Sequence, residues 1–219
     1  MMARIITRNT ILDTDLYCLT GEKFSLGRSN IDVVREMLDS GIKLVQYREK
    51  EKKMGAKYEE CLVIRDMTRE AGAAFIVNDD IELARLVDAD GVHIGQEDLP
   101  VEAVRRLVGE EMTIGLSTHS PAEARDAVKR GADYIGVGPI FKTFTKEDVV
   151  DPVGFEYLDY VVNNIDIPFV AIGGIKEHNI GEVVRRGASC VALVTEIVGE
   201  ENINEKINAL RHEIEAAKE

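Results

Sequence analysis

Carboxylates follow two successive apolar runs near the middle of this 219-residue chain. The first run ends in Asn78-Asp79-Asp80, and the second is followed by Gln96-Glu97-Asp98. If both runs are neighbouring strands, about 4.8 Å apart, Asp79 and Asp98 are close enough to share one hard cation such as Mg²⁺. Asp80 is expected to point away from them. The alternative is that these residues only cap the helices that follow.

A row of hydrogen-bond donors ends an earlier apolar run. Side chains alternate along a strand, so Gln46, Arg48 and Lys50 share one face, while Val45 and Tyr47 point the other way. Donors directed together into the mouth of a barrel suit phosphate oxygens. A solvated run of charges is the alternative interpretation, because the segment continues as EKEKK.

Ser117 and His119 close a further run. Ser120 begins a Ser-Pro-Ala-Glu capping box, so it serves as the N-cap of the next helix and leaves Ser117 for another role. His119 offers an acid–base group, but no nucleophile accompanies it. His93 lies within a run and is interpreted as a hydrogen-bonded structural histidine.

Groups that bind anionic oxygens recur in the second half of the chain. The loop Lys142–Asp148 contains the hydroxyls of Thr143 and Thr145 between two lysines, and its length makes it a candidate lid. Gly173-Gly174 and Val194-Thr195 end the last two apolar runs. Glycine amides after a seventh strand, with a short helix after an eighth, form the phosphate site of many barrels.

The elements that must position these residues alternate regularly along the chain. Apolar runs predict strands starting near Asp15, Lys43, Ala74, Gly91, Met112, Asp133, Ile167 and Ser189. Amphipathic segments predict helices at Ile31–Ser40, Tyr58–Ala71, Ile81–Val87, Val101–Val108, Ala122–Arg130, Phe155–Asn163, Ile180–Arg186 and Asn202–Ala217. Glycines at 41, 72, 131 and 187 follow helices as C′ residues do.

Alternating strands and helices of this kind predict an α/β protein with a parallel sheet covered on both faces. Eight such units close most economically into a (β/α)8 TIM barrel, in which every strand-to-helix loop opens on one face. An open doubly wound sheet is the alternative, but no GxGxxG follows the first strand. Residues 1–13 are interpreted as a leader segment and 14–219 as a single barrel domain.

The composition limits the class of protein. A net charge of −13 argues against a nucleic-acid or anionic-membrane surface, and no run approaches the length of a membrane span. Three cysteines, far apart and without a CxxC, fit reduced thiols in the cytoplasm. The expected partners are therefore small molecules. The oligomeric state is left open, with a homo-oligomer as one alternative.

Taken together, the motifs resemble the thiamine-phosphate synthase family. The pieces that carry the resemblance run in order through nearly the whole chain: QYREK, VND, DGVHIGQEDLP, GLSTHS, DYIGVGPIFKTFTK and VAIGGI. The resemblance implies a (β/α)8 fold and a transferase. Its reaction joins a hydroxymethylpyrimidine diphosphate to a hydroxyethylthiazole phosphate, and releases pyrophosphate. Phe144 stands where the family often has Pro, and Thr195 where Ser is usual.

The resemblance also implies roles for individual residues. The pyrimidine diphosphate would be bound by Gln46, Arg48, Lys50, Asn78, Ser117 and Lys146, of which Lys50, Ser117 and Lys146 would serve catalysis. Mg²⁺ would be held by Asp79 and Asp98. The thiazole phosphate would be bound by Thr143, Thr145, Gly173, Gly174, Val194 and Thr195.

Three other interpretations stay open on the sequence alone. The thiazole tautomerases share this scaffold but need no diphosphate–metal apparatus. A non-catalytic barrel could bind thiamine phosphates as a sensor. A sugar-phosphate isomerase would need a general base at a strand end and no diphosphate clamp. The intact QYREK, VNDD, QED and TK favour the synthase.

Overall fold

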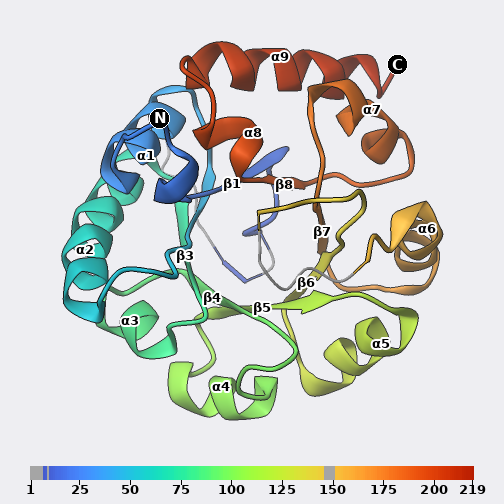
Figure 1. The fold of residues 1–219 in the computed structure, drawn as a ribbon. Coiled ribbons are helices and arrows are strands. Elements are labelled where there is room, and N and C mark those ends of the chain that lie inside the picture. The colour runs from blue at the N-terminus through green and yellow to red at the C-terminus, as the bar shows by residue number, and fades with distance from the viewer. Residues whose placement is uncertain (1–6, 9, 146–150) are drawn as a thin grey trace.

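The computed structural model describes residues 7, 8, 10–145 and 151–219. Eight parallel strands hydrogen-bond in sequence order and close into a barrel, with β1 beside β8 (Figure 1). The strands are β1 (Leu16–Leu19), β2 (Leu44–Tyr47), β3 (Ala74–Asn78), β4 (Gly91–Ile94), β5 (Thr113–Thr118), β6 (Tyr134–Val137), β7 (Phe169–Ile172) and β8 (Val191–Leu193). The predicted (β/α)8 barrel is confirmed.

Helices form a ring outside the strands (Figure 1). Seven of them follow β1 to β7: α1 (Asn30–Asp39), α2 (Met54–Ala71), α3 (Ile81–Leu86), α4 (Val101–Val108), α5 (Pro121–Arg130), α6 (Gly154–Asn164) and α7 (Glu177–Arg185). A short helix, α8 (Thr195–Val198), and the long α9 (Ile203–Ala216) follow β8. The 3₁₀ turn η1 (Glu22–Phe24) precedes α1.

Helix ends agree with the sequence better than helix starts do. The predicted C′ glycines at 41, 72, 131 and 187 all have positive φ, between 60° and 104°. Glycine adopts a positive φ without strain because glycine has no Cβ. Two starts were placed too late. α2 begins at Met54 and α7 at Glu177. The first turn of α2, Met54-Gly55-Ala56, is exposed, and that of α7 is polar, so neither carries the apolar periodicity of the rest of its helix.

The capping box predicted at Ser120 is only half formed. The Ser120 hydroxyl accepts the N–H of Glu123 at 3.3 Å, as expected of an N-cap. The Glu123 carboxylate, however, accepts the N–H of His119 at 2.8 Å rather than that of Ser120. The side chain therefore reaches back one residue further and holds the end of β5 against the start of α5.

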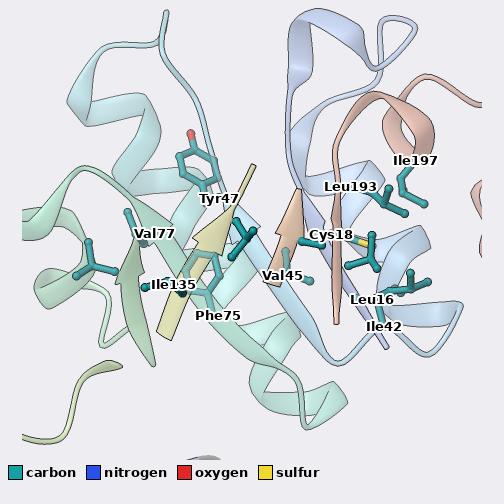
Figure 2. Packing of buried hydrophobic residues seen from close by; sticks show 14 of the residues in the cluster. Leu16, Cys18, Ile42, Val45, Tyr47, Phe75, Val77, Ile135, Leu193 and Ile197 are labelled. Atoms are coloured by element: carbon teal, nitrogen blue, oxygen red, sulfur yellow. The ribbon is translucent and has the colours of Figure 1, made fainter. Parts of the chain in front are cut away.

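Two apolar clusters separate the inside of the barrel from the helix layer. The outer cluster lies between strands and helices and includes Val45 and Tyr47 of β2 (Figure 2). The inner cluster includes Leu44 from the same strand, and Gln46, which is 2% exposed, alternates with the outward pair. The predicted alternation is confirmed from Leu44 to Tyr47, since the Gln46 side chain faces the barrel interior. The strand ends before Arg48 and Lys50, and Lys50, contrary to the prediction, does not line the cavity at the carboxyl ends of the strands.

Two residues of the predicted leader pack into the inner cluster. Ile11 and Leu12 are 1% and 8% exposed and pack with buried side chains of the barrel interior. Leu12 also borders a small surface hollow lined by Pro168, Phe169 and Ser189, which lie where β7 and β8 begin. This short segment therefore covers the amino ends of the strands and leaves the opposite end open.

The three cysteines are buried free thiols, as expected. Cys18 belongs to the outer cluster and Cys190 to the inner one, and burial raises the pKa of both thiols. Across the parts of the chain that the structure describes, no helix is long and apolar enough to cross a membrane.

Candidate active site

A cavity of about 400 Å³ opens at the carboxyl ends of the strands. Ten of the residues predicted from the sequence line it: Gln46, Arg48, Asn78, Ser117, Thr143, Thr145, Gly173, Gly174, Val194 and Thr195. They come from strand ends and loops spread over most of the chain. Closure of the barrel brings them together, because all strand-to-helix loops lie on one face.

Lys50, Asp79 and Asp98 form a charged cluster beside the cavity. The Lys50 ammonium is ion-paired with the Asp79 carboxylate. Asp79 follows Asn78, which itself lines the cavity. None of the three cluster residues lines the cavity directly. The cluster therefore lies at the rim, where a ligand group that extends out of the cavity would meet it.

Asp79 is held in an uncommon backbone conformation. Its φ is +60°, in the left-handed region that residues other than glycine rarely adopt. Its N–H donates to the carbonyl oxygen of His93 at 2.9 Å, which extends the pairing of β3 with β4 by one residue. Outliers of this kind gather at functional sites, where the surrounding structure holds them in place.

The environment of Asp98 suits a cation ligand. Partial burial raises the pKa of its carboxyl; the N–H of Gly95, 2.7 Å away, opposes that shift, and the neighbouring Asp79 carboxylate raises the pKa further. Mutual repulsion of this kind is relieved when a cation binds between two carboxylates.

The donor set fits Mg²⁺. The described residues contain no group of three His, Cys, Asp or Glu side chains arranged to hold a metal. Mg²⁺ does not require such a group. It usually takes one or two carboxylates and fills its other positions with water and substrate phosphate oxygens. Asp79 and Asp98 together meet that requirement.

Arg48 lines the cavity and interacts with Asp79 of this cluster. Burial lowers the pKa of its guanidinium, while the carboxylates of Asp79 and Glu49 counteract that shift, and an arginine keeps its charge in such a setting. Thr20 fixes the backbone at this point: its hydroxyl accepts the Arg48 N–H at 2.8 Å and donates to the Arg48 carbonyl oxygen at 3.2 Å. A charged donor is thus held at the end of β2.

The opposite side of the cavity combines backbone and hydroxyl groups. Gly173 and Gly174 have φ of +100° and +64°, and an added Cβ would lie 2.4 Å from Pro139 and 2.6 Å from the Lys142 carbonyl oxygen respectively. Only glycine fits either position. The hydroxyls of Thr143 and Thr145 lie 3.1 Å apart, and the predicted short helix, α8, begins at Thr195. These groups suit anionic oxygens.

A chain of hydrogen-bonded polar side chains crosses the barrel interior at the floor of the cavity. Gln46 Nε2 donates to Tyr17 Oη at 2.7 Å, and Tyr17 Oη lies 3.1 Å from Tyr134 Oη. His93 Nδ1 lies 2.9 Å from Tyr134 Oη, and its Nε2 lies 2.9 Å from Ser117 Oγ. His93 is hydrogen-bonded, as its position within a strand predicted.

Several residues of the cavity wall were not predicted from the sequence. Tyr17 was predictable, since alternation in LYCL places it on the inner face opposite Cys18. Phe24 and Lys176 gave no local signal. Glu196, 9% exposed, lines the wall and is ion-paired with Lys176 and Lys206, both at 3.4 Å.

Two further candidates have different outcomes. Lys146, predicted to bind the diphosphate and serve catalysis, lies outside the described residues, as does the end of the predicted lid loop. His119 lines the cavity, but its Nδ1 contacts the Gly138 carbonyl oxygen at 2.6 Å. That contact accounts for one ring nitrogen.

The family model described as thiamine monophosphate synthase matches residues 16–197. The chain belongs to this family. A curated thiamine-phosphate synthase from Pelotomaculum thermopropionicum is 67% identical, and the match covers 92% of each chain. Another, from Lawsonia intracellularis, is 55% identical over 93% of this chain and 94% of the relative.

A solved structure of a family member has the same fold. The thiamine phosphate pyrophosphorylase from Pyrococcus furiosus superimposes with a TM-score of 0.85 at 35% identity, and the match covers 96% of this chain and 98% of that one. The residues matched by the family model, 16–197, include all eight strands. The family resemblance inferred from the motifs is therefore confirmed.

Proposed function

We propose that the chain is a thiamine-phosphate synthase. It joins 4-amino-2-methyl-5-(diphosphooxymethyl)pyrimidine to 4-methyl-5-(2-phosphooxyethyl)thiazole, and yields thiamine phosphate and pyrophosphate. The observation that carries the proposal is family membership at 67% identity over 92% of the chain. The cavity supports it, because cationic donors lie on one side and glycine amides with threonine hydroxyls on the other.

The two sides of the cavity divide the substrates between them. The pyrimidine diphosphate lies with its ring between Gln46 and Ser117 and its diphosphate toward Arg48 and the rim cluster. The thiazole phosphate lies toward the opposite side, formed by Thr143, Thr145, Gly173, Gly174, Val194 and Thr195. This arrangement brings the pyrimidine methylene carbon and the thiazole nitrogen together in the centre.

The reaction needs electrostatic stabilisation more than a protein nucleophile. The methylene C–O bond breaks with its electron pair leaving on pyrophosphate, and the exocyclic amino group stabilises the carbocation. The lone pair of the thiazole nitrogen then forms the new C–N bond. The enzyme therefore holds two substrates in line and stabilises the charge that gathers on the leaving group.

Mg²⁺ belongs to this proposal as the resident cofactor, held by Asp79 and Asp98. When bound, it neutralises part of the diphosphate charge. Lys50 is positioned to donate to the same leaving group, with its ammonium already beside Asp79. Lys146 is proposed for a similar role. The same proposal places the enzyme in a reducing compartment such as the cytoplasm, because its cysteines are buried free thiols.

The decisive experiment mixes both substrates with the protein and Mg²⁺ and measures thiamine phosphate and pyrophosphate. Equal amounts of the two products, formed at a rate proportional to enzyme concentration, are expected. Binding of either substrate without turnover would instead indicate a sensor barrel. Isomerisation of a thiazole or sugar phosphate without pyrophosphate release would indicate another barrel enzyme.

A further inference from the structure

The row of hydrogen-bonded side chains at the floor of the cavity joins two side chains of the proposed pyrimidine site. Gln46 and Ser117 both line the cavity, on β2 and β5 respectively. Tyr17, Tyr134 and His93 connect them through hydrogen bonds of 2.7 to 3.1 Å. Tyr17 and Tyr134 are each 1% exposed, so their hydroxyls depend on one another and on protein partners.

The barrel interior leaves space for these hydrogen-bonded side chains. An added Cβ at Gly115 would lie 2.1 Å from the Tyr134 ring and 2.5 Å from His93 Nδ1, so glycine leaves the space that these two side chains occupy. The His93 and Tyr134 rings lie 5.4 Å apart between centroids, and the two tyrosine rings lie 6.4 Å apart. Burial raises the pKa of both tyrosine hydroxyls, so each carries one proton to donate.

Proton counting gives the chain a direction. The Gln46 amide nitrogen can only donate, so Tyr17 Oη accepts from it. Either hydroxyl can donate between Tyr17 and Tyr134; in the relay Tyr17 gives its proton to Tyr134 Oη, 3.1 Å away. Tyr134 then donates to His93 Nδ1. A histidine that accepts at Nδ1 carries its proton on Nε2, and Nε2 donates to Ser117 Oγ. The Ser117 proton is left to point into the cavity, and the Gln46 carbonyl oxygen is left as an acceptor there.

We propose that Tyr17, Tyr134 and His93 form a directional hydrogen-bond relay that presents Ser117 as a donor and Gln46 as an acceptor to an aminopyrimidine ring. The ligand assignment rests on the proposed function. An aminopyrimidine offers the complementary pair, an amino donor and a ring-nitrogen acceptor. Tyr17 and His93 also line the floor of the cavity. In this proposal all three relay residues are positioning residues, since they act through the two side chains at the ends.

The first test needs no substrate. Nitrogen-15 NMR of the histidine rings, about two pH units above the ordinary histidine pKa of about 6.5, distinguishes the two neutral tautomers. The other histidines, at 119, 178 and 212, are assigned by replacing each in turn. The relay requires the Nε2–H tautomer at His93. An Nδ1–H tautomer would reverse the direction of the chain and overturn the proposal.

Phenylalanine variants separate the relay from simple packing. Tyr134→Phe removes the donor to His93 and should give a mixture of tautomers. Tyr17→Phe should keep the Nε2–H tautomer, because Tyr134 can still donate. The matched control is Tyr157→Phe, a buried tyrosine whose hydroxyl donates to Thr118 at 2.7 Å outside the relay; it should leave His93 unchanged. The same tautomer in Tyr134→Phe as in the parent would count against the relay.

A double-mutant cycle tests the link to Ser117. Tyr134→Phe should lower kcat/KM for the pyrimidine diphosphate about two- to tenfold, the value of one neutral hydrogen bond. In a Ser117→Ala background the same change should have almost no further effect, because the relay then has nothing to orient. The control Tyr157→Phe should give the same small effect in both backgrounds. Additive losses for Tyr134→Phe would overturn the proposal.

The two proposals fail in different ways. One outcome is a protein that forms no thiamine phosphate but shows the Nε2–H tautomer, and loses it in Tyr134→Phe. That outcome would support the relay and contradict the aminopyrimidine as its ligand. An active enzyme with the Nδ1–H tautomer at His93 would support the proposed function and contradict the relay.

Discussion

Neighbouring aspartates at the end of β3 have different partners. Asp79 belongs to the charged cluster at the cavity rim and pairs with Lys50. Asp80 turns the other way, as predicted, and its carboxylate accepts from Lys57 of α2 at 2.8 Å. Its side chain makes no capping hydrogen bond to α3. Two adjacent carboxylates of the same type therefore provide a matched pair for testing the metal site.

Replacing Asp79 or Asp98 by Asn should raise the Mg²⁺ concentration needed for half-maximal rate and remove most activity. Asn keeps the size of each side chain and tolerates the left-handed backbone at position 79 better than Ala would, so the fold should survive. The loss of a negative ligand weakens cation binding. Initial rates measured over a range of Mg²⁺ concentrations, with a thermal melt of each variant, check this.

The control for the metal site is Asp80→Asn. It should leave the Mg²⁺ requirement unchanged and lower the free energy of unfolding by about 1–3 kcal/mol, because the mostly buried Lys57 ammonium loses its charged partner. A Mg²⁺ requirement that rises as much in this variant as in Asp79→Asn would show that the metal site is misplaced.

Lys50→Ala should slow the chemical step. Charge accumulates on the departing pyrophosphate, and the loss of one preorganised donor commonly costs about 10²-fold or more in rate. Single-turnover kinetics at saturating substrate isolate that step. The matched control is Lys53→Ala, an exposed lysine at the start of α2, which should keep the parent rate. Parent-like rates for Lys50→Ala would remove its assigned role.

At the scale of elements, α9 is tied to the rest of the barrel by charged side chains. Arg211 donates to Asp15 before β1 at 2.9 Å and to the carbonyl oxygen of Ser40 after α1 at 2.9 Å. Lys206 pairs with Glu177 of α7 at 2.9 Å and with Glu196 of α8 at 3.4 Å. The last helix therefore fastens both α8, at the cavity wall, and the start of the first strand.

Lys206 should make stability fall at high pH. Burial lowers the pKa of its ammonium, but the surrounding carboxylates outweigh that effect and raise it to about 12. An unfolded lysine has a pKa of about 10.4. The stabilisation is therefore complete below about pH 10.4 and is lost as the pH rises toward 12. Lys206→Met should flatten the alkaline decline in melting temperature.

The control for this pH dependence is Lys218→Met. Among the residues that the structure describes, Lys218 pairs only with Glu215 one turn earlier, at 2.8 Å, and half of its side chain is exposed. Its removal should leave the alkaline decline as steep as in the parent. If Lys206→Met gives the same steep decline, another group carries the effect.

At the scale of the whole molecule, the barrel is packed from one end and open at the other. Ile11 and Leu12 belong to the inner cluster at the amino ends of the strands, and the cavity opens at the carboxyl ends. Catalysis and closure of the core are thereby placed at opposite faces, as in other barrels.

Ile11→Ala should destabilise the protein by about 2–5 kcal/mol. The Ile11 side chain is 1% exposed, so its truncation leaves a cavity in the core. Activity well below the melting temperature should be unchanged, since the substitution lies away from the cavity. Denaturant unfolding and steady-state kinetics measure the two effects. The control Leu86→Ala, at a site 67% exposed, should change stability by less than about 0.5 kcal/mol. Equal losses in both variants would show that Ile11 does not close the core.

Local patterns in the sequence were enough to predict the order of elements, the barrel and most of the cavity wall. Apolar runs reveal strands because burial on both faces leaves no polar alternation, and the glycines at 41, 72, 131 and 187 mark helix ends because only glycine adopts positive φ without strain. Residues that follow strands were then predicted to meet, because a parallel barrel places every strand end on one face. Gln46, Asn78, Ser117 and Thr195 do line one cavity.

Tertiary structure alone decided which side chains pair. Glu123 bonds the N–H of His119 instead of Ser120, Glu196 joins Lys176 and Lys206 at the cavity wall, and Ile11 enters the core from a segment without periodicity. The chain from Gln46 to Ser117 also depends on Tyr17 and Tyr134, whose hydroxyls meet across 117 residues of sequence. A residue's type and spacing indicate the face on which it lies, but a hydrogen bond requires two atoms within about 3 Å, and only closure of the barrel sets that distance.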